Sequence, residues 1–211
     1  MATLITKAIW KERNSVIHGG FPSQIETMVR SIQATFNAYN LALSCNQAAH
    51  QTCWEPPPSP WIKINVDAAV RTTEAAGTAV VRDHLGRILA MKTELFHNPE
   101  PVIAEANAML LGLQLARDNH WSSVVIESEC LTLVNGWNGC SEVPWHSDHI
   151  FPQMHDIAPH FSNLVINYVS RVCNYFAHNL VAWAYARSSF GDLALTEVPE
   201  SVCQDHTQWT P

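Results

Sequence analysis

Residues 61–67, Trp-Ile-Lys-Ile-Asn-Val-Asp, decide how the rest of the chain is interpreted. Apolar and polar residues alternate along this stretch, which is typical of a β-strand with one buried face. The stretch ends in Asp67, which follows Val66 and precedes Ala68-Ala69. A carboxylate in such apolar surroundings is costly unless something compensates its charge. The stretch therefore predicts a core strand that carries a functional acid.

Two further strands are expected directly after this one. Residues 78–82 and 87–91 are rich in apolar residues, and residues 83–86, Asp-His-Leu-Gly, have the composition of a turn. Short connections join antiparallel strands, whereas parallel strands need a long crossover. The three segments therefore predict a three-stranded antiparallel meander.

The second half of the chain alternates helices and strands. Residues 101–115 have apolar side chains at helical spacing and begin with Pro101, which fits a first helical turn because that turn needs no amide donor. Residues 123–126 predict a strand buried on both faces, and residues 164–169 predict a fifth strand. Further helices are expected at 130–138, 150–160 and 175–188. This order predicts an α/β fold in which helices flank a mixed sheet.

The chain divides into four parts by composition. Residues 1–48 have apolar residues at steps of three and four and predict a helical N-terminal extension. Residues 49–60 form a linker that ends in Glu-Pro-Pro-Pro-Ser-Pro, a stiff extended sequence. Residues 61–190 hold the predicted sheet and helices. Residues 191–211 contain acids but no Lys or Arg, and we expect a loosely ordered acidic tail.

The composition excludes several classes of protein. Of the 211 residues, 47% are hydrophobic and only 15% are charged, so a disordered charged chain is excluded. The formal net charge of −7 argues against a basic protein that coats nucleic acid. No apolar stretch approaches the ~18 residues of a membrane helix, and because Lys7, Lys11 and Arg13 interrupt the first stretch of the sequence we expect no secretory signal there. We therefore expect an intracellular protein of the nucleus or cytoplasm, whose six cysteines are reduced thiols.

Three carboxylates are candidate metal ligands. Asp67 lies inside the first strand, Glu105 lies one turn into the long helix, and Glu129 lies where the fourth strand gives way to a helix. If the first and fourth strands are neighbours, the three acids meet and repel one another. A divalent cation removes that repulsion, and hard oxygen ligands favour Mg²⁺ or Mn²⁺. The alternative is local, because Glu105 and Glu129 both lie where a helix dipole favours an acid.

Several segments in a fixed order resemble the motifs of a type-one ribonuclease H domain. They are Asn-Val-Asp-Ala-Ala at 65–69, Ala-Gly-Thr-Ala-Val-Val-Arg-Asp-His-Leu-Gly at 76–86, Ala-Glu-Ala-Asn-Ala at 104–108, Ile-Glu-Ser-Glu-Cys at 126–130 and Asn-Tyr-Phe-Ala-His-Asn-Leu-Val at 174–181. The resemblance covers residues 61–188 and points to the reverse-transcriptase-like ribonuclease H domains of plant non-LTR retroelements and their domesticated derivatives. Residues 9–14 resemble the segment that precedes this domain there.

The resemblance implies a fold and an activity. The fold is a five-stranded mixed sheet in the order 3-2-1-4-5, with the first three strands antiparallel, flanked by helices. The activity is endonucleolytic hydrolysis of the RNA strand of RNA–DNA hybrids, in which two Mg²⁺ ions some ~3.5–4 Å apart clamp the scissile phosphate. The implied partner is an RNA–DNA hybrid or other nucleic acid, and the chain is expected to be a monomer.

The resemblance also assigns the catalytic residues. Asp67 falls on the family's first-strand aspartate, which is the central metal ligand, and Glu105 falls on its helix glutamate. Two positions depart from the family. Glu129 falls on the strand-end aspartate and is one methylene longer, and His178 falls on the fourth acidic position. A neutral imidazole is a poor Mg²⁺ ligand but suits Mn²⁺, so we expect slow turnover in Mg²⁺ and rescue by Mn²⁺.

Other interpretations stay open. His178 is alternatively a general acid–base or a solvated helix residue. The longer arm of Glu129 fixes a ligand less tightly, so a catalytically weakened or inactive nucleic-acid-binding module is the alternative function. A pure interaction domain that uses the N-terminal helices is a third.

Recognition of a hybrid depends on shape and on phosphate contacts. The candidate contacts are Ala68, Gly77, Arg171 and Asn174. Acids outnumber basic residues in 61–190, so affinity is expected to be modest and salt-sensitive. Trp137 and Trp145 are further candidates, for base stacking.

His146 and His149 flank Asp148 and resemble a metal pair. The pair has no third ligand in place, so a solvated loop is the expected interpretation.

Overall fold

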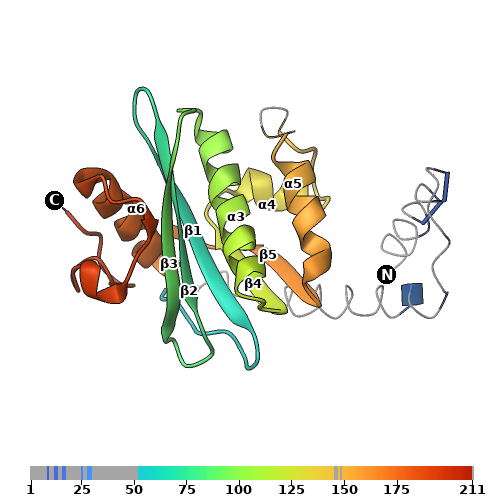
Figure 1. Ribbon diagram of the computed structural model, residues 1–211, viewed down its shortest axis with the longest axis horizontal. Coiled ribbons are helices and arrows are strands. Elements are labelled where there is room, and N and C mark those ends of the chain that lie inside the picture. Colours follow the sequence, from blue (N-terminus) through green and yellow to red (C-terminus); the bar gives the residue numbers. More distant parts are fainter. Residues whose placement is uncertain are drawn as a thin grey trace. The chain divides into compact units, whose positions relative to one another are not determined.

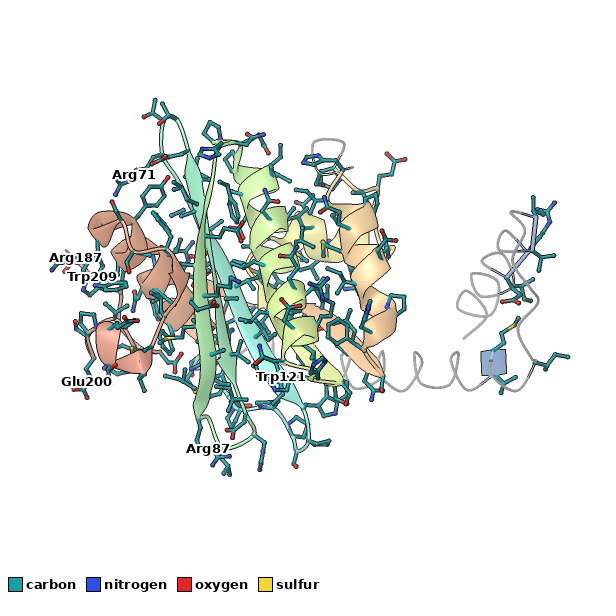
Figure 2. The ribbon with its side chains drawn as sticks, viewed as in Figure 1. Arg71, Arg87, Trp121, Arg187, Glu200 and Trp209 are labelled. Atoms are coloured by element: carbon teal, nitrogen blue, oxygen red, sulfur yellow. The ribbon has the colours of Figure 1, made fainter. Side chains whose placement is uncertain are left out.

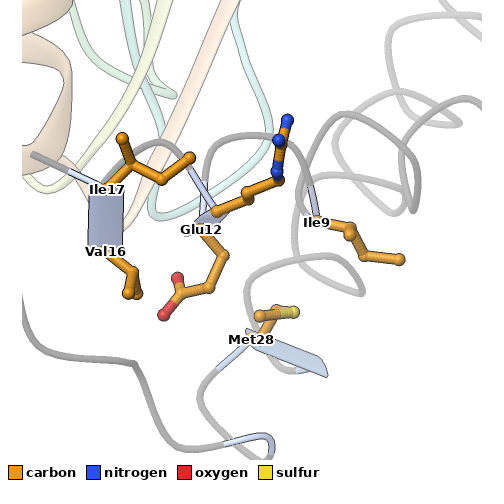
Figure 3. A pocket seen from close by; sticks show the side chains of 6 residues that line it. Ile9, Glu12, Val16, Ile17 and Met28 are labelled. Carbon is orange, nitrogen blue, oxygen red and sulfur yellow. The ribbon is translucent and has the colours of Figure 1, made fainter.

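The computed structural model describes residues 52–144, 147 and 149–210, together with residues 9, 12, 13, 16, 17, 25, 28 and 29. The chain divides into two units, residues 1–50 and 51–211. In the first unit the described residues are helical, and a hollow of about 400 Å³ is lined by Ile9, Glu12, Arg13, Val16, Ile17 and Met28 (Figure 3). The rest of the predicted helical extension lies outside the described residues, as do Trp145, His146 and Asp148.

The second unit is built on one mixed sheet in the order β5-β4-β1-β2-β3-β6 (Figure 1). The strands are β1 (Ile62–Val70), β2 (Ala75–Arg82), β3 (Ile88–Phe96), β4 (Ser123–Ser128), β5 (Asn163–Tyr168) and β6 (Gly191–Asp192). The first three are antiparallel, whereas β4 runs parallel to both β1 and β5. The predicted five-strand order is confirmed, and the two-residue β6, paired with β3, was not expected.

Helices cover both faces of the sheet. In Figure 1, α3 (Pro101–Asp118), α4 (Leu131–Trp137) and α5 (Phe151–Ile157) lie on one face, and α6 (Tyr175–Arg187) lies on the other. Short 3₁₀ turns are η2 (Ala158–His160), η3 (Arg171–Cys173) and η4 (Leu195–Glu197). Among the described helices, none has the length and apolarity needed to cross a membrane.

The start of α3 follows the prediction. Pro101 occupies its first turn, where a missing amide proton is tolerated. Glu100 caps the helix by accepting a hydrogen bond from the amide of Ile103 at 2.8 Å.

Apolar side chains pack on both sides of the sheet. On the α3 side, Ile64 and Val66 of β1 belong to the larger core, and on the α6 side Val80 and Met91 pack with Phe176. Burial of such side chains stabilises a fold by about 1.5–3 kcal/mol each. Because helices cover both faces, β2 is buried at every position.

The polar face of β1 differs from the prediction of a half-buried strand. Lys63, Asn65 and Asp67 point to the α6 side, yet they are only 7%, 0% and 1% exposed. Each has a partner. Lys63 Nζ lies 2.7 Å from Glu127 Oε1, Asn65 donates to Glu127 Oε2 at 2.9 Å, and Asp67 Oδ2 lies 2.9 Å from His178 Nδ1. The predicted alternation of apolar and polar residues is present in β1. Its apolar side chains enter the hydrophobic core, whereas its polar side chains are buried on the other face of the sheet instead of facing solvent. Buried polar groups are tolerated where they are hydrogen-bonded.

The C-terminal segment corrects the expectation of a loosely ordered tail. Val198 and Val202 are buried against Val80 and α6. Asn179 of α6 holds the segment by donating to the carbonyl of Thr207 at 2.8 Å and accepting from the amide of Trp209 at 2.7 Å. Asp205 pairs with the buried Arg82 at 2.5 Å. The segment is acidic, as the sequence showed, but its apolar residues complete the core on the α6 side of the sheet.

Candidate active site: carboxylates at the ends of β1 and β4

The fold brings together the four residues that the sequence singled out as catalytic. Asp67 lies near the end of β1, Glu129 directly follows the neighbouring parallel strand β4, Glu105 lies in α3, and His178 lies in α6. Burial raises the pKa of both Glu105 and Glu129, and the negative charge of Asp67 raises each further. The charge of Asp67 therefore reaches both glutamates, and a metal site shared by the three acids stays a prediction.

Asp67 is joined to the opposite helix. Its side chain is 1% exposed, and its Oδ2 lies 2.9 Å from Nδ1 of His178, which is 21% exposed. An Asp carboxylate only accepts hydrogen bonds and a guanidinium only donates them, so the tautomer of His178 decides whether Nδ1 donates to Asp67 or accepts from Arg171 Nη1. The histidine is thus placed at the cluster and is not a solvated residue of an outer helix face.

Glu105 is the carboxylate whose charge is least compensated. Its Oε2 is buried without a hydrogen-bond partner. Burial raises the pKa of Glu105 well above its ordinary value, the charges of Asp67 and Glu129 raise it further, and Arg171 opposes the shift. Since an unsatisfied buried oxygen costs about 1–3 kcal/mol, this atom is a position at which a cation is favourable.

Glu129 has partners at both oxygens. Its Oε1 accepts a hydrogen bond from Asn174 Nδ2 at 3.0 Å, and its Oε2 lies 2.5 Å from Arg171 Nε. Burial raises the pKa of Glu129, as does the charge of Asp67, whereas Asn174 and Arg171 lower it. This carboxylate is therefore directed toward Arg171 and Asn174.

Arg171 of η3 is the positive charge beside the acids. Its Nη1 contacts Nδ1 of His178, in addition to the Nε contact with Glu129, and its side chain is 48% exposed. Burial alone lowers the pKa of Arg171, but the attraction of Asp67 and Glu129 outweighs burial and raises it. The sequence placed Arg171 near the site only as a nucleic-acid contact; the structure gives it ion-pair contacts within the cluster.

The arrangement fits a cation in part. The unpartnered Glu105 Oε2 and the mutual repulsion of the acids both favour positive charge at this point. Within the described part of the chain, however, no group of three or more His, Cys, Asp or Glu side chains is arranged to hold a metal ion. Glu129 is engaged by Arg171 and Asp67 by His178, so Glu105 Oε2 is the oxygen of the three acids that is buried without a partner.

Two asparagines, Asn65 and Asn174, form hydrogen bonds next to the acidic residues. Asn65 of β1 donates to Asn174 Oδ1 at 3.1 Å, and Asn174 Nδ2 donates to the carbonyl of Val66 at 3.0 Å. Both asparagines are completely buried. Sequence reasoning missed Asn65 and named Asn174 only as a nucleic-acid contact. These two hydrogen bonds join residues more than a hundred positions apart, so the only local signal was the polar residue two positions before Asp67.

Asn65 also connects the site to the linker. Its Oδ1 accepts from Trp54 Nε1 at 2.9 Å and from Arg82 Nη2 at 3.0 Å. The guanidinium carbon of Arg82 lies 3.5 Å from the centroid of the Trp54 ring. Asp205, Arg82 and Asn65 thus form a continuous polar path from the C-terminal segment toward Asn174.

The remaining candidate contacts are placed as follows. Ala68 of β1 pairs directly with Gly77 of β2. Gly77 is buried inside the strand, and a Cβ atom there would lie 2.7 Å from Phe96 Cε2, so packing accounts for this glycine. The indole of Trp137 stacks on the ring of His155 with centroids 4.6 Å apart, which occupies one of its faces.

Lys63 and Arg82, counted in the sequence among the basic residues of the domain, are buried and ion-paired. Among the other basic residues of the unit, Arg71 and Arg87 are exposed at its surface (Figure 2). Phosphate contacts therefore fall to a smaller set of side chains than the composition indicated.

Comparisons with known proteins agree with this architecture. Residues 65–184 match the family described as reverse transcriptase-like. RNase H1 of the halophilic archaeon Halobacterium salinarum NRC-1 superposes with a TM-score of 0.57 at 18% identity, over 60% of this chain and 98% of that one. The N-terminal RNase H domain of a Mycobacterium tuberculosis protein gives 0.56 at 20% identity, over 61% and 96% of the two chains.

A third structure, LC11-RNase H1 in complex with an RNA/DNA hybrid, gives a TM-score of 0.55 at 21% identity, over 60% of this chain and 98% of that one. A comparison with curated proteins finds no match. At these identities the likeness establishes the RNase H fold.

Proposed function

Because this chain belongs to the reverse transcriptase-like family and has the RNase H fold, we propose that it hydrolyses the RNA strand of RNA–DNA hybrids endonucleolytically, with divalent cations. One observation carries the proposal. Asp67, Glu105 and Glu129 come from separate parts of the fold, the charges of Asp67 and Glu129 act on Glu105, and Glu105 keeps a buried oxygen without a hydrogen-bond partner. Buried acids that raise one another's pKa destabilise a fold, and such groups are typical of functional sites.

The acids have distinct roles in the proposal. Asp67, held within β1, is the proposed central cation ligand, and Glu105 is proposed to supply its buried, unpartnered oxygen as a second ligand. Glu129 completes the acidic set. A divalent cation, Mg²⁺ or Mn²⁺, supplies positive charge toward the scissile phosphate and acidifies the attacking water when bound. His178, whose Nδ1 lies 2.9 Å from Asp67 Oδ2, is the proposed proton-transfer group.

The proposed substrate is an RNA–DNA hybrid, and the related fold of LC11-RNase H1, solved with such a hybrid, supports this choice. The exposed arginines provide phosphate contacts, and the net charge of −7 predicts modest, salt-sensitive affinity. The order of motifs supports an origin in a plant non-LTR retroelement. The proposal places the protein inside the cell, in the nucleus or cytoplasm, as a monomer.

A second candidate function is a nucleic-acid-binding module that has lost turnover. The specific observation in its favour is the engagement of Glu129 by Arg171 and Asn174, together with His178 at the fourth acidic position. A site in which one acid is already neutralised binds cations less strongly. This candidate keeps hybrid binding and predicts no cleavage.

The test compares cleavage of a 5′-labelled RNA–DNA hybrid with cleavage of the same RNA as a single strand and as a duplex with RNA. We expect cleavage of the hybrid alone, dependent on added Mg²⁺ or Mn²⁺, and its loss in Asp67→Asn. Filter binding of the same hybrid separates the binding module, which retains the hybrid uncut, from a pure interaction domain, which does not bind it.

A further inference from the structure

We propose that Asp205 of the C-terminal segment is a positioning residue for Glu129 of the acidic site. It acts through three intermediate side chains, which are Arg82, Asn65 and Asn174. The inference rests on the proposed function, because Glu129 is one of the acids of that site. It goes beyond that function by giving the C-terminal segment control over the geometry of the site. Each link in the connection is a hydrogen bond.

Asp205 fixes the direction of a buried guanidinium. Arg82 is 2% exposed, and its Nη1 donates to Asp205 Oδ2 at 2.5 Å. The guanidinium carbon lies 3.5 Å from the centroid of the Trp54 ring, so the indole limits its movement on one side. With Nη1 held by the carboxylate, Nη2 donates to Asn65 Oδ1 at 3.0 Å. The direction of this second donor therefore depends on Asp205.

Asn65 transmits an orientation as well as a contact. Its Oδ1 accepts from Trp54 Nε1 at 2.9 Å and from Arg82 Nη2 at 3.0 Å. Its Nδ2 donates to Glu127 Oε2 at 2.9 Å and to Asn174 Oδ1 at 3.1 Å. A carboxamide donates two hydrogen bonds and accepts two, so the capacity of this side chain is fully used. A flipped amide would place its nitrogen against two donors, so Trp54 and Arg82 select the observed orientation.

Asn174 passes this orientation to Glu129. Its Oδ1 accepts from Asn65, and its Nδ2 donates to the carbonyl of Val66 and to Glu129 Oε1, both at 3.0 Å. The connection thus runs from the cation of Arg82 to the anion of Glu129, with every donor facing an acceptor. Hydrogen bonds aligned in this way polarise and strengthen one another. A change at the Arg82 end is therefore expected to reach the carboxylate.

The two side chains that fix Arg82 lie outside residues 65–184, which match the family. Trp54 belongs to the linker and Asp205 to the C-terminal segment, and both contact the guanidinium. The polar residues beside the acidic site are thus tied to flanking segments on both sides of the matched region. The C-terminal segment therefore has a contact with the site that is separate from its apolar packing.

The C-terminal segment has attachments other than Asp205. Asn179 of α6 donates to the carbonyl of Thr207 at 2.8 Å and accepts from the amide of Trp209 at 2.7 Å. The Asp205 side chain is 32% exposed, so its replacement opens no cavity in the core. Asp205→Ala removes the ion pair, whereas Asp205→Glu keeps a carboxylate. Asp192→Ala is the matched control, because it removes a 79% exposed acid from the same segment.

Hydrogen exchange of the Asn174 side-chain amide, followed by NMR in the full-length chain, tests the connection without a substrate. In Asp205→Ala we expect this amide to exchange about tenfold faster, because local opening becomes more frequent when its partners are no longer fixed. Asp205→Glu and Asp192→Ala are expected to exchange like the natural chain. The side-chain amide of Asn163, which donates to Ser123 Oγ at 3.1 Å, is the reference in the same spectra. Unchanged exchange at Asn174, or equal acceleration at Asn174 and Asn163, overturns the inference.

Cleavage of an RNA–DNA hybrid by the same variants separates this inference from the proposed function. We expect Asp205→Ala to lower kcat about tenfold and to leave KM within about twofold, because a misplaced acid affects the transition state more than binding. If the natural chain cleaves, an unchanged kcat in Asp205→Ala, with or without a raised KM, overturns the inference and leaves the proposed function intact. A natural chain that does not cleave, together with faster exchange at Asn174 alone, supports the positioning by Asp205 and contradicts the hydrolytic function.

Discussion

Asn65 donates a hydrogen bond from its Nδ2 to Asn174 Oδ1, and the two atoms lie 3.1 Å apart although 109 positions separate the residues in sequence. Asn65 precedes Asp67 by two residues on β1, and Asn174 directly precedes the helix that carries His178. Asn174 also donates to Glu129 at 3.0 Å. A single pair of amides therefore fixes the spacing between β1, the residue after β4 and the start of α6.

Replacement of Asn174 tests this support. In Asn174→Ala, the carbonyl of Val66 and Glu129 Oε1 lose their donor, and Asn65 loses an acceptor. Leaving buried polar groups unsatisfied costs about 1–3 kcal/mol. We expect the free energy of unfolding in urea to fall by about this amount. Asn163→Ala is the control, since the side chain of Asn163 makes its bond to Ser123 at the start of β5; an equal loss in both variants contradicts the central role of Asn174.

Glu105→Gln tests the strain in the acidic cluster. Burial and the neighbouring acids raise the pKa of Glu105 in the folded chain above its unfolded value. A raised folded pKa means that the stability contribution is present below the unfolded pKa and lost as pH rises through the folded pKa. In the absence of divalent cations we therefore expect Glu105→Gln to melt higher than the natural chain at neutral pH, by about 2–4 °C per kcal/mol.

The pH dependence provides the internal check on this prediction. The advantage of Glu105→Gln is expected to shrink as pH is lowered toward the ordinary range of glutamate, because the natural carboxyl is then protonated as well. Glu94→Gln, at an exposed position of β3, is expected to show no such trend. A melting-temperature difference that does not change with pH is the outcome that contradicts the account.

Asp205→Ala tests the packing of the C-terminal segment. The variant leaves the guanidinium of Arg82, which is 2% exposed, without its ion-pair partner. Removal of one partner from a largely buried pair is expected to cost about 1–3 kcal/mol in the free energy of unfolding. Asp192→Ala is the control, because the carboxylate of Asp192 is 79% exposed and lies 3.7 Å from Lys92. If both variants unfold at the same urea concentration, the segment does not stabilise the unit in the way described.

The two departures from the family motif predict a preference between metals. His178 suits Mn²⁺ better than Mg²⁺, and Glu129 fixes its oxygens through a longer arm than aspartate. We expect the natural chain to cleave a hybrid faster in Mn²⁺ than in Mg²⁺. In the double variant Glu129→Asp, His178→Asp, we expect faster cleavage in Mg²⁺ and a smaller advantage of Mn²⁺. Equal or lower activity of the natural chain in Mn²⁺ contradicts this prediction.

Much of the fold could be predicted because the decisive signals are local. The alternation in residues 61–67, the turn at 83–86 and the position of Pro101 each depend on neighbours in sequence, and the corresponding elements were located to within a few residues. The expected pairing of the strand that carries Asp67 with the strand that precedes Glu129 is likewise present, since β1 and β4 are parallel neighbours.

What could not be predicted depends on partners distant in sequence. The polar residues of β1 pattern like a solvent-exposed face, and only the packing of α6 reveals that Lys63 and Asn65 are buried and paired. Likewise, the segment after residue 190 has an acidic composition typical of a loose tail, but Val198 and Val202 pack against apolar residues of α6. The engagement of Glu129 by Arg171 depends on how η3 approaches β4, which no local pattern encodes.

The chemical ends of the cleaved RNA test the central claim most directly. Hydrolysis by a water at the carboxylate cluster leaves a 3′-hydroxyl and a 5′-phosphate, whereas attack by the neighbouring 2′-hydroxyl, assisted only by His178 and Arg171, leaves a 2′,3′-cyclic phosphate. The account predicts 3′-hydroxyl and 5′-phosphate ends from an RNA–DNA hybrid, formed only with added Mg²⁺ or Mn²⁺ and abolished in Asp67→Asn. Cyclic phosphate ends, or cleavage that Asp67→Asn leaves intact, would contradict it.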